Sequence, residues 1–345
     1  MLHLTSVASA LPGEPVGNDE LEERFGLSRQ WIETFIGTRT RHFAADLATG
    51  KATHTLADLC RQAAERALDR AAVDPGRIGF VVLATATPDA LMPTTAAVVA
   101  DRLGVTGAPV YQLQSGCSGA VQAFALADAL IGAGARAGLV MGGDVCVKHL
   151  DLTREFRRMP PGELVNYVLF GDGAGAAVVT AEPSGASGAS GAVVRLRAAV
   201  HRPVLPGHAP GQRVEWYGAA DRAGGGSPVT EDYKAIEHRV PELSERICTE
   251  LLDGLGWSGQ QLHYLLPPQL GGRMTARIAA GLRERLGAER AEEVSCVAET
   301  GNTGNALVLS QLERLLALMT PGQRALCACV ESSKWIAAGF GLEAS

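Results

Sequence analysis

The chain has 345 residues, of which 46% are hydrophobic and 20% are charged. A chain of this length and composition can bury a large core and is long for one compact domain, so we expect two domains or one duplicated unit. Its formal net charge is −6 and it has no long basic run, which argues against nucleic acid as a partner.

Export and membrane insertion are not expected either. Residues 1–15 lack the basic start of a secretory signal, and no segment approaches the roughly 18 apolar residues that cross a bilayer. The seven cysteines have neither a disulfide framework nor metal-ligand spacing. We therefore expect a cytoplasmic protein with reduced thiols, no metal site and no membrane association.

The first clear elements are a helix and a strand. Helical spacing of apolar residues predicts a helix over residues 56–72, followed by a turn and a β-rich run at residues 78–87. The same order returns later in the chain. Residues 243–256 form a predicted helix, 258–261 a turn, and 262–267 a short buried strand.

A longer repeat relates SGCSGAVQAFALADALI (115–131) to TGNTGNALVLSQLERLL (300–316) without a gap. In each copy a strand-like segment enters a Gly-x-x-Gly turn that opens an apolar helix, and Cys117 in the first copy matches Asn302 in the second. This duplication predicts an α/β protein of two βαβ-rich halves, residues 1–180 and 181–345, with parallel sheets that face each other and are covered by helices. The Gly/Ser-rich residues 178–194 are expected to connect them.

Cys117 is the leading nucleophile candidate. It is expected in the first turn of a helix, where free N–H groups and the helix dipole favour a thiolate and can hold an oxyanion. A buried cysteine is usually core packing, as we expect for Cys60 and Cys248. The glycine-bracketed turn of Cys117, repeated around an amide in the second half, favours catalysis instead.

Four segments together resemble the ketoacyl-ACP synthase III group of thiolase-fold enzymes: ELEERFGLSRQWIETFIGTRTRH, QSGCSGA, FGDGAGAAVV and TGNTGNA. The resemblance implies a homodimer with the duplicated five-layered αβαβα thiolase fold. It also implies an acyl-enzyme on Cys117, reached by a phosphopantetheine arm through a narrow tunnel. No resident cofactor is implied, because the acyl group arrives as an acyl-phosphopantetheine or coenzyme A thioester. We interpret FGDGAGAAVV as a structural turn, since it lacks the lysine of a phosphate loop.

One family residue is missing. Asn302 matches the family's active-site asparagine, but the histidine of its His-Gln-Ala-Asn segment falls on Pro268, with Gln269 beside it at the substrate site. His263 comes five residues too early and is expected on the far side of the sheet. Proline has no donor, and losing one enolate donor costs about 3 to 4 kcal/mol. Decarboxylative carbon–carbon bond formation is therefore disfavoured, and acyl transfer is favoured.

The C-terminal loop VESSKWIAAGF stands where the family carries a glycine-rich loop. Glu331 in this loop could act as the base, with a pKa raised by burial beside Cys117. Alternatively, it is a solvated carboxylate or the partner of Lys334. The resemblance implies that Ser332 and Ser333, together with Gly116, supply oxyanion-hole backbone.

Other positions bear on the substrate and partners. Trp31 is kept where the family stacks the adenine of coenzyme A, but Phe35 replaces a usual arginine, so coenzyme A recognition is expected to be weak. Met92 matches the position from which the partner subunit closes the acyl pocket. A basic rim suited to an acyl carrier protein, or simply a solvated face, is formed by Arg154, Arg157 and Arg158.

The preferred interpretation is an acyltransferase that moves an acyl group through Cys117 to a thiol, hydroxyl or amine in a specialised-metabolite pathway of the polyketide or antibiotic kind. A second is a decarboxylating condensing enzyme whose base is Glu331 or a residue of the partner subunit. A third is a non-catalytic partner subunit of such an enzyme. Retention of both Cys117 and Asn302 argues against the third.

Overall fold

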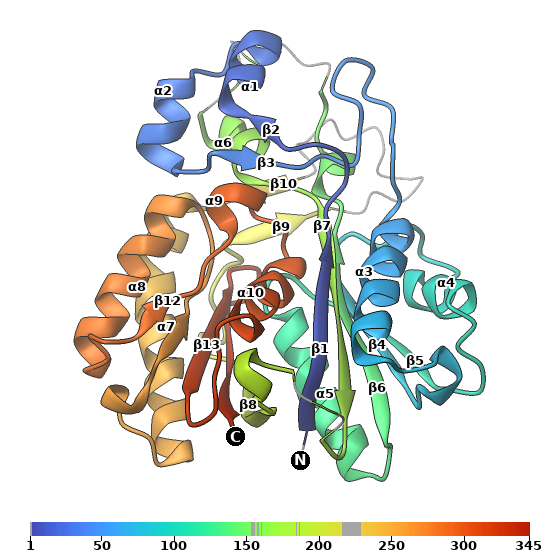
Figure 1. The fold of residues 1–345 in the computed structure, drawn as a ribbon. Helices are drawn as coiled ribbons and strands as arrows, with labels where there is room; N and C mark the ends of the chain where they lie inside the picture. Colours follow the sequence, from blue (N-terminus) through green and yellow to red (C-terminus); the bar gives the residue numbers. More distant parts are fainter. Residues whose placement is uncertain are drawn as a thin grey trace.

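The computed structural model describes residues 2–152, 156, 159, 161–183, 185, 187–215 and 229–345. Ten strands form one sheet in the order β12-β11-β13-β14-β8-β1-β7-β6-β4-β5 (Figure 1). The first half of the chain supplies β1 (Leu2–Ala10), β4 (Val81–Thr85), β5 (Val110–Gln114), β6 (Ala137–Asp144) and β7 (Gly173–Thr180). The second half supplies β8 (Val194–Pro203), β11 (Tyr264–Leu266), β12 (Glu292–Glu293), β13 (Arg324–Glu331) and β14 (Ile336–Ala344).

The two halves have the same topology. From the edge to the centre, the order is β5-β4-β6-β7-β1 in one half and β12-β11-β13-β14-β8 in the other. The halves join where β1 pairs with β8 in antiparallel register: Leu2 with Leu196, His3 with Arg195 and Leu4 with Val194. The duplication in the sequence is therefore a duplication of the whole sheet pattern.

The sheet is mixed, so the expectation of parallel sheets was only partly right. β4 is parallel to β5 and β6, and β11 is parallel to β12 and β13. The other pairs are antiparallel. Only residues 332–335 separate β13 from β14, which is too short for the crossover that a parallel pair requires.

Helices lie on both sides of each half-sheet. α3 (Leu56–Ala71) and α4 (Thr95–Arg102) cover the outer face of the first half, and α7 (Tyr233–Leu255) and α8 (Gly272–Leu286) cover that of the second (Figure 1). α5 (Gly119–Gly132) and α10 (Ala306–Leu316) lie between the halves, where Phe124 and Leu309 share one buried core with strands of both halves. This confirms the five-layered αβαβα arrangement.

Local signals explain the predicted helices. Thr55 and Asp58 form a capping box at the start of α3, and a buried face of the helix follows it, so the observed bounds differ from the prediction by one residue. α7 starts earlier than predicted because Asp232 accepts a hydrogen bond from Ala235 N–H and caps the helix there. None of the helices in the described ranges is long and apolar enough to span a membrane.

Shorter elements gather at one end of the sheet (Figure 1). They are α1 (Asn18–Phe25), α2 (Arg29–Trp31), a π-helical turn (Ile32–Ile36), α6 (Pro161–Leu169), α9 (Val297–Thr300) and the paired strands β2 (Val16–Gly17) with β3 (Thr40–Arg41) and β9 (Gln212–Val214) with β10 (Val229–Glu231). Single 3-10 turns occur at Pro75–Arg77, Cys146–His149, Ala189–Gly191 and Gly259–Gln261.

Candidate active site

The turn that carries Cys117 joins β5 to α5. Gly119 N–H donates to the Gly116 carbonyl oxygen at 2.8 Å, which closes the turn. A Cβ atom on Gly119 would lie 2.4 Å from Asn305 Oδ1, so this position requires glycine. Cys117 is half-buried and precedes the first residue of α5 by two positions, so it lies just outside the helix instead of in its first turn.

The matching turn of the second half presents Asn302. Its Oδ1 accepts a hydrogen bond from Gly304 N–H at 3.0 Å, and its Nδ2 group has no hydrogen-bond partner within the described ranges. Gly304 has φ of +58°, and a Cβ atom there would lie 2.2 Å from Asp144 Oδ2. Asn302 therefore keeps one amide donor available in a fixed orientation.

Asp144 ties the two turns together. Its Oδ2 accepts from the backbone N–H of Asn305 at 2.8 Å and from Asn305 Nδ2 at 2.9 Å. Its Oδ1 accepts from the hydroxyls of Thr85 and Thr87, each at 3.0 Å. Asn305 Nδ2 also donates to Ser115 O at 2.9 Å, so the Cys117 turn is held by the same group.

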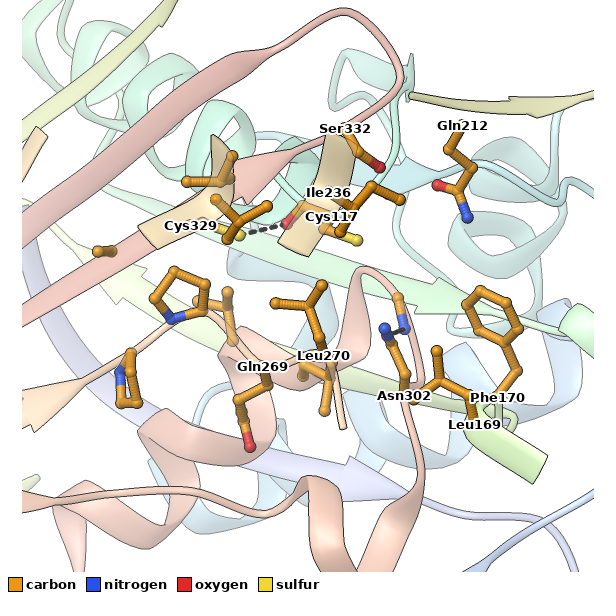
Figure 2. A pocket seen from close by; sticks show the side chains of 18 of the residues that line it. Cys117, Leu169, Phe170, Gln212, Ile236, Gln269, Leu270, Asn302, Cys329 and Ser332 are labelled. Carbon is orange, nitrogen blue, oxygen red and sulfur yellow. Dashed lines mark hydrogen bonds between the residues drawn. The ribbon is translucent and has the colours of Figure 1, made fainter. Parts of the chain in front are cut away.

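A cavity opens between the turns (Figure 2). Pro268 lines it and brings no hydrogen-bond donor. Gln269 also lines the cavity, but its side chain points away from Cys117, and its Oε1 accepts from Cys296 N–H at 2.6 Å and Val297 N–H at 2.8 Å. The Gln269 side chain therefore caps the start of α9 instead of facing Cys117. The lining includes Cys117, Phe170, Gln212, Glu231, Tyr233, Ile236, Asn302 and Ser332.

A second, largely apolar cavity also reaches Cys117. Its walls include Gly116, Cys146, His149, Leu150, Phe170, Val214 and Val229. The two cavities share Cys117, Phe170, Gln212 and Gly304. The candidate nucleophile thus stands where two separate spaces meet.

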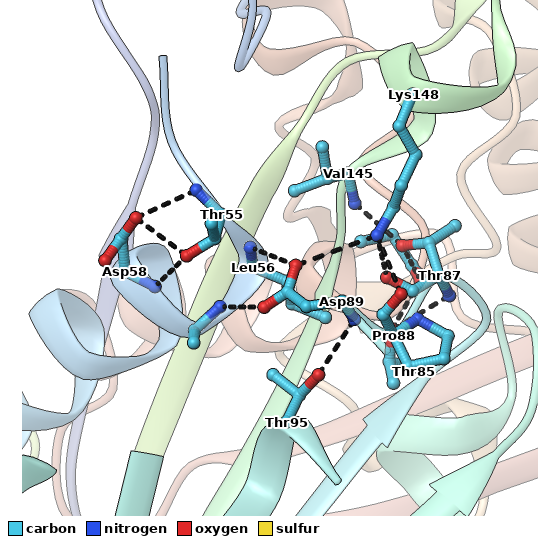
Figure 3. Close-up of polar contacts among 12 residues, drawn as sticks. Thr55, Leu56, Asp58, Thr85, Thr87, Pro88, Asp89, Thr95, Val145 and Lys148 are labelled. Carbon is cyan, nitrogen blue, oxygen red and sulfur yellow. Dashed lines mark hydrogen bonds and ion pairs between the residues drawn. The ribbon is translucent and has the colours of Figure 1, made fainter. Parts of the chain in front are cut away.

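The loop after β4 borders the second cavity, and Figure 3 shows the polar contacts that hold it. Lys148 Nζ donates to the carbonyl oxygens of Thr87 at 2.5 Å and Pro88 at 2.9 Å, while Asp89 accepts from two N–H groups at the start of α3. The loop is thereby fixed at its base. Its tip is exposed: Met92 is 87% exposed and Leu91 is 71% exposed.

Glu331 contacts the Cys117 turn through its side chain. Its Oε2 accepts from the hydroxyls of Ser115 at 2.9 Å and Ser118 at 2.5 Å, and its Oε1 accepts from the Ser333 hydroxyl. The side chain is buried and is not among the residues that line either cavity. Glu331 is therefore not solvated, and Lys334, its expected partner in a surface pair, donates to His208 O instead.

The expected thiolate at Cys117 is not supported. Burial raises the pKa of the Cys117 thiol to about 12, and the nearby carboxylates of Glu331, Asp144 and Glu231 act in the same direction. Cys117 does not directly join α5, which begins at Gly119. The thiol therefore needs a proton acceptor when it reacts.

Several predicted residues lie outside the cavities. Trp31 packs against Phe35 with their ring centroids 6.3 Å apart, and His263 accepts from Arg324 N–H at 3.3 Å at the start of β13. In FGDGAGAAVV, a Cβ atom on Gly171 would lie 2.3 Å from Thr300 O, which supports the structural interpretation. The predicted basic rim lies outside the described residues: Arg154, Arg157 and Arg158.

Sequence reasoning missed two polar residues of the cavities. Glu231 lines the first cavity, and His149 lines the second; in each, one buried atom, Glu231 Oε2 or His149 Nε2, has no hydrogen-bond partner among the described residues. Burial raises the pKa of Glu231 to about 7 and lowers the pKa of His149. A buried glutamate in VTEDYKA gives little signal by itself, because its strand partner Gln212 lies 19 positions earlier and no local pattern links the two.

Comparisons with known proteins agree with this geometry. Residues 111–196 match the family model for 3-oxoacyl-[acyl-carrier-protein (ACP)] synthase III. The beta-ketoacyl-[acyl-carrier-protein] synthase III of Rhodospirillum rubrum is 33% identical over 311 residues, which are 88% of this chain and 87% of the relative. Synthase III 3 of Streptomyces coelicolor is 33% identical over 338 residues, which are 94% and 91% of the two chains.

Solved structures extend the likeness. A structure described as AbyA1, a tetronic acid condensing enzyme, is 55% identical, has a TM-score of 0.93, and the match covers 99% of this chain and 100% of that one. The 3-oxoacyl-(acyl carrier protein) synthase III of Pseudomonas aeruginosa is 28% identical with a TM-score of 0.80, covering 99% and 98%.

Proposed function

Because the chain belongs to the beta-ketoacyl-[acyl-carrier-protein] synthase III family, we propose that Cys117 takes an acyl group from a carrier-protein or coenzyme A thioester and passes it to a second substrate without decarboxylating that substrate. One observation carries this proposal: Cys117, Asn302 and Pro268 line one cavity. We align Pro268 with the histidine that the resemblance implies there. No resident cofactor is required by this chemistry.

The absence of a hydrogen-bond donor at Pro268 supports acyl transfer over decarboxylation. Decarboxylation creates an enolate whose oxygen needs hydrogen-bond donors, and the loss of one donor costs about 3 to 4 kcal/mol. Of the two enolate donors that the family resemblance implies, a histidine and an asparagine, the asparagine donor Asn302 Nδ2 remains. Acyl transfer to a thiol or hydroxyl forms no enolate, so it tolerates proline at residue 268, although a hydroxyl acceptor still needs a base.

We propose that each of the two cavities binds a different substrate group. The largely apolar cavity beside Leu150 and Val214 suits the acyl chain, whereas the cavity with Asn302 and Glu231 suits the acceptor. Gly116 and Ser332 border these spaces and are proposed to place oxyanion-hole backbone. For Glu331 we propose a positioning role, because two of its three hydroxyl partners, Ser115 and Ser118, belong to the Cys117 turn.

A specific observation favours a carbon acceptor as a second candidate. The 55% identity and TM-score of 0.93 relate this chain to a protein described as a tetronic acid condensing enzyme. Tetronic acids are five-membered lactones that contain an enolised 1,3-dicarbonyl group, so building one from two acyl thioesters requires a carbon–carbon and a carbon–oxygen bond. A carbon between two carbonyls is acidic without decarboxylation, and it therefore needs a base more than it needs the missing histidine.

Partners are proposed on the same basis. An acyl carrier protein would deliver the acyl group, and the position of Trp31 outside both cavities leaves coenzyme A delivery open. The exposed tip at Met92, together with the edge strand β5, fits a homodimer in which one subunit reaches into the other. A role in a specialised-metabolite pathway is consistent with the tetronic acid relative.

Intact mass spectrometry tests the proposal. The protein would be incubated with a panel of acyl N-acetylcysteamine, coenzyme A and carrier-protein thioesters, and we expect one acyl adduct that disappears in Cys117→Ala. Malonyl thioesters should release little carbon dioxide. A full adduct in Cys117→Ala, or efficient malonyl decarboxylation by the wild-type protein, would contradict the proposal.

A further inference from the structure

Glu231 is the acidic residue that lines the cavity shared by Cys117, Asn302 and Pro268. Within the described part of that lining there is no histidine, lysine or arginine. Among the described lining residues, the titratable groups that could take a proton from an acceptor bound there are this carboxylate, the Cys117 and Cys329 sulfurs and the Tyr233 hydroxyl. Glu231 is the group among these whose ordinary chemistry is proton acceptance near neutral pH.

The backbone of Glu231 is held on both sides. The residue ends β10 and lies opposite Gln212 of β9, whose Nε2 donates to Glu231 Oε1. The next residue, Asp232, caps α7 and donates its N–H to Gly211 O at 2.7 Å. A side chain fixed between a hairpin and a helix start is well ordered for catalysis.

Within the described ranges, the second carboxylate oxygen is not hydrogen-bonded, and the neighbouring Tyr233 hydroxyl donates to Asn166 Oδ1 at 2.9 Å instead. Glu231 Oε2 is buried and has no hydrogen-bond partner among the described residues, and no cation in the described ranges forms an ion pair with the side chain. A buried carboxylate oxygen without a partner is destabilising, so its retention in a cavity points to a partner supplied by the substrate. Glu331 differs, because three hydroxyls already occupy both of its oxygens.

We propose that Glu231 is the catalytic base of this site and removes the proton from the acceptor, a hydroxyl or a carbon between two carbonyls, as that acceptor attacks the acyl group on Cys117. This inference rests on the proposed acyl transfer. It assigns to the second half of the chain a proton acceptor that Pro268 cannot provide.

The step balances without any further reactant. The acceptor O–H or C–H bond breaks as its proton moves to Glu231 Oε2, and the acceptor atom bonds to the acyl carbon. The carbon–sulfur bond to Cys117 then breaks, and the sulfur receives the proton from Glu231. The carboxylate and the thiol are both regenerated, and nothing is oxidised or reduced.

The pKa values of Glu231 and Cys117 support proton transfer from the acceptor to Glu231 and then to the Cys117 sulfur. Burial raises the pKa of Glu231 to about 7, while the neighbouring Tyr233 and Gln212 act to lower it. The Cys117 thiol, with a pKa of about 12, retains the proton it finally receives. Among the described residues, the titratable groups that face Glu231 are Tyr233, whose own pKa is raised by burial, and Cys117. Base activity should therefore rise with pH through about 7 and be lost at lower pH.

Single-turnover transfer can isolate this role. Acyl-enzyme would be formed to equal occupancy from hexanoyl-N-acetylcysteamine, and its decay followed by intact mass with three acceptors: N-acetylcysteamine, lactoyl-N-acetylcysteamine and acetoacetyl-N-acetylcysteamine. These present a thiol, a hydroxyl and an activated carbon. The variants are Glu231→Gln, Glu231→Asp and, as a matched control, Glu237→Gln, whose carboxylate is exposed on α7 and pairs with Arg277.

We expect Glu231→Gln to slow transfer to the hydroxyl and carbon acceptors by about 10² to 10⁴-fold and to remove their pH dependence near 7. Transfer to the thiol at pH 8.5 should change little, because much of that thiol is already ionised. Glu231→Asp should keep part of the rate and a pH dependence, and Glu237→Gln should match the wild type.

Two failures can be told apart. A wild-type protein that never becomes acylated at Cys117 overturns the proposed function and this inference with it. An acylated Glu231→Gln protein that transfers to all three acceptors at wild-type rates, or that loses all three equally, overturns the role of Glu231 alone.

Discussion

Ser118, at the start of the Cys117 helix, donates a 2.5 Å hydrogen bond to Oε2 of Glu331, at the end of β13. This contact crosses from one half of the duplicated fold to the other, 213 positions apart in the chain. Glu331 is thus joined to the nucleophile's turn through side chains of that turn. Variants of Glu331 can therefore show whether this residue positions the Cys117 turn or transfers a proton.

Replacing Glu331 separates these roles. In Glu331→Gln the amide can still bond the surrounding hydroxyls, so transfer to a hydroxyl acceptor should stay close to the wild-type rate. If Glu331 were the base, the same variant would slow transfer by about 10² to 10⁴-fold while leaving Cys117 loading nearly intact. Single-turnover decay of the acyl-enzyme distinguishes the two.

Glu331→Ala should act on stability instead. It leaves the hydroxyls of Ser115, Ser118 and Ser333 without their shared acceptor, so the free energy of unfolding should fall by about 1 to 3 kcal/mol. Urea denaturation followed by circular dichroism measures this. An unchanged midpoint would show that the hydroxyl cluster contributes little.

If the proposed function holds, a histidine at residue 268 should add decarboxylation of malonyl thioesters. Pro268 lines the cavity with Asn302, so Pro268→His adds a second donor there and should raise carbon dioxide release from malonyl thioesters by up to about 10² to 10³-fold. Pro268→Ala, which removes the ring without adding a donor, is the matched control. Equal gains in both variants would attribute the effect to loop shape.

The Asn302 turn should not accept a side chain at residue 304. Gly304→Ala forces a non-glycine residue to φ of +58° and brings Cβ to 2.2 Å from Asp144 Oδ2, so unfolding free energy should drop by about 2 to 6 kcal/mol. Gly132→Ala, at the end of α5 with nothing within 4 Å, is the control and should be neutral or slightly stabilising. Similar denaturation midpoints for both variants would contradict the packing argument.

Charge at the tip of the loop after β4 should weaken a homodimer. Met92 is 87% exposed in the single subunit, and Met92→Glu would bury a carboxylate if that tip enters a partner. Sedimentation velocity should show dissociation at a concentration where the wild type remains dimeric. A monomeric wild type would remove the basis of this prediction.

The sequence revealed most about the repeated parts. The pairing of Cys117 with Asn302 was visible because both stand in Gly-x-x-Gly turns before apolar helices, and the steric need for Gly119 and Gly304 explains the pattern. The helix at residues 56–72 followed from the spacing of its apolar residues. These are local features, and local features are what a single sequence encodes most directly.

Features that depend on long-range contacts were missed. The protonation state of Cys117 is set by burial and by carboxylates from distant segments, so the helix-dipole argument gave the wrong direction. Glu231 is brought to the cavity by pairing with Gln212, and no local signal marks that pairing. Glu331 was correctly expected near Cys117, but its three hydroxyl partners depend on how the two halves meet.

The pairing of β1 with β7 has a consequence for synthesis on the ribosome. β1 ends at Ala10, whereas β7 begins at Gly173. At about 5 to 20 residues per second, roughly 10 to 30 seconds separate the emergence of these two neighbours. During that interval α3 is the earliest large native neighbour of the apolar β1 segment, and it packs on β1 in the finished protein. The nascent chain should therefore depend on α3, or on a chaperone, to keep β1 from associating with other chains.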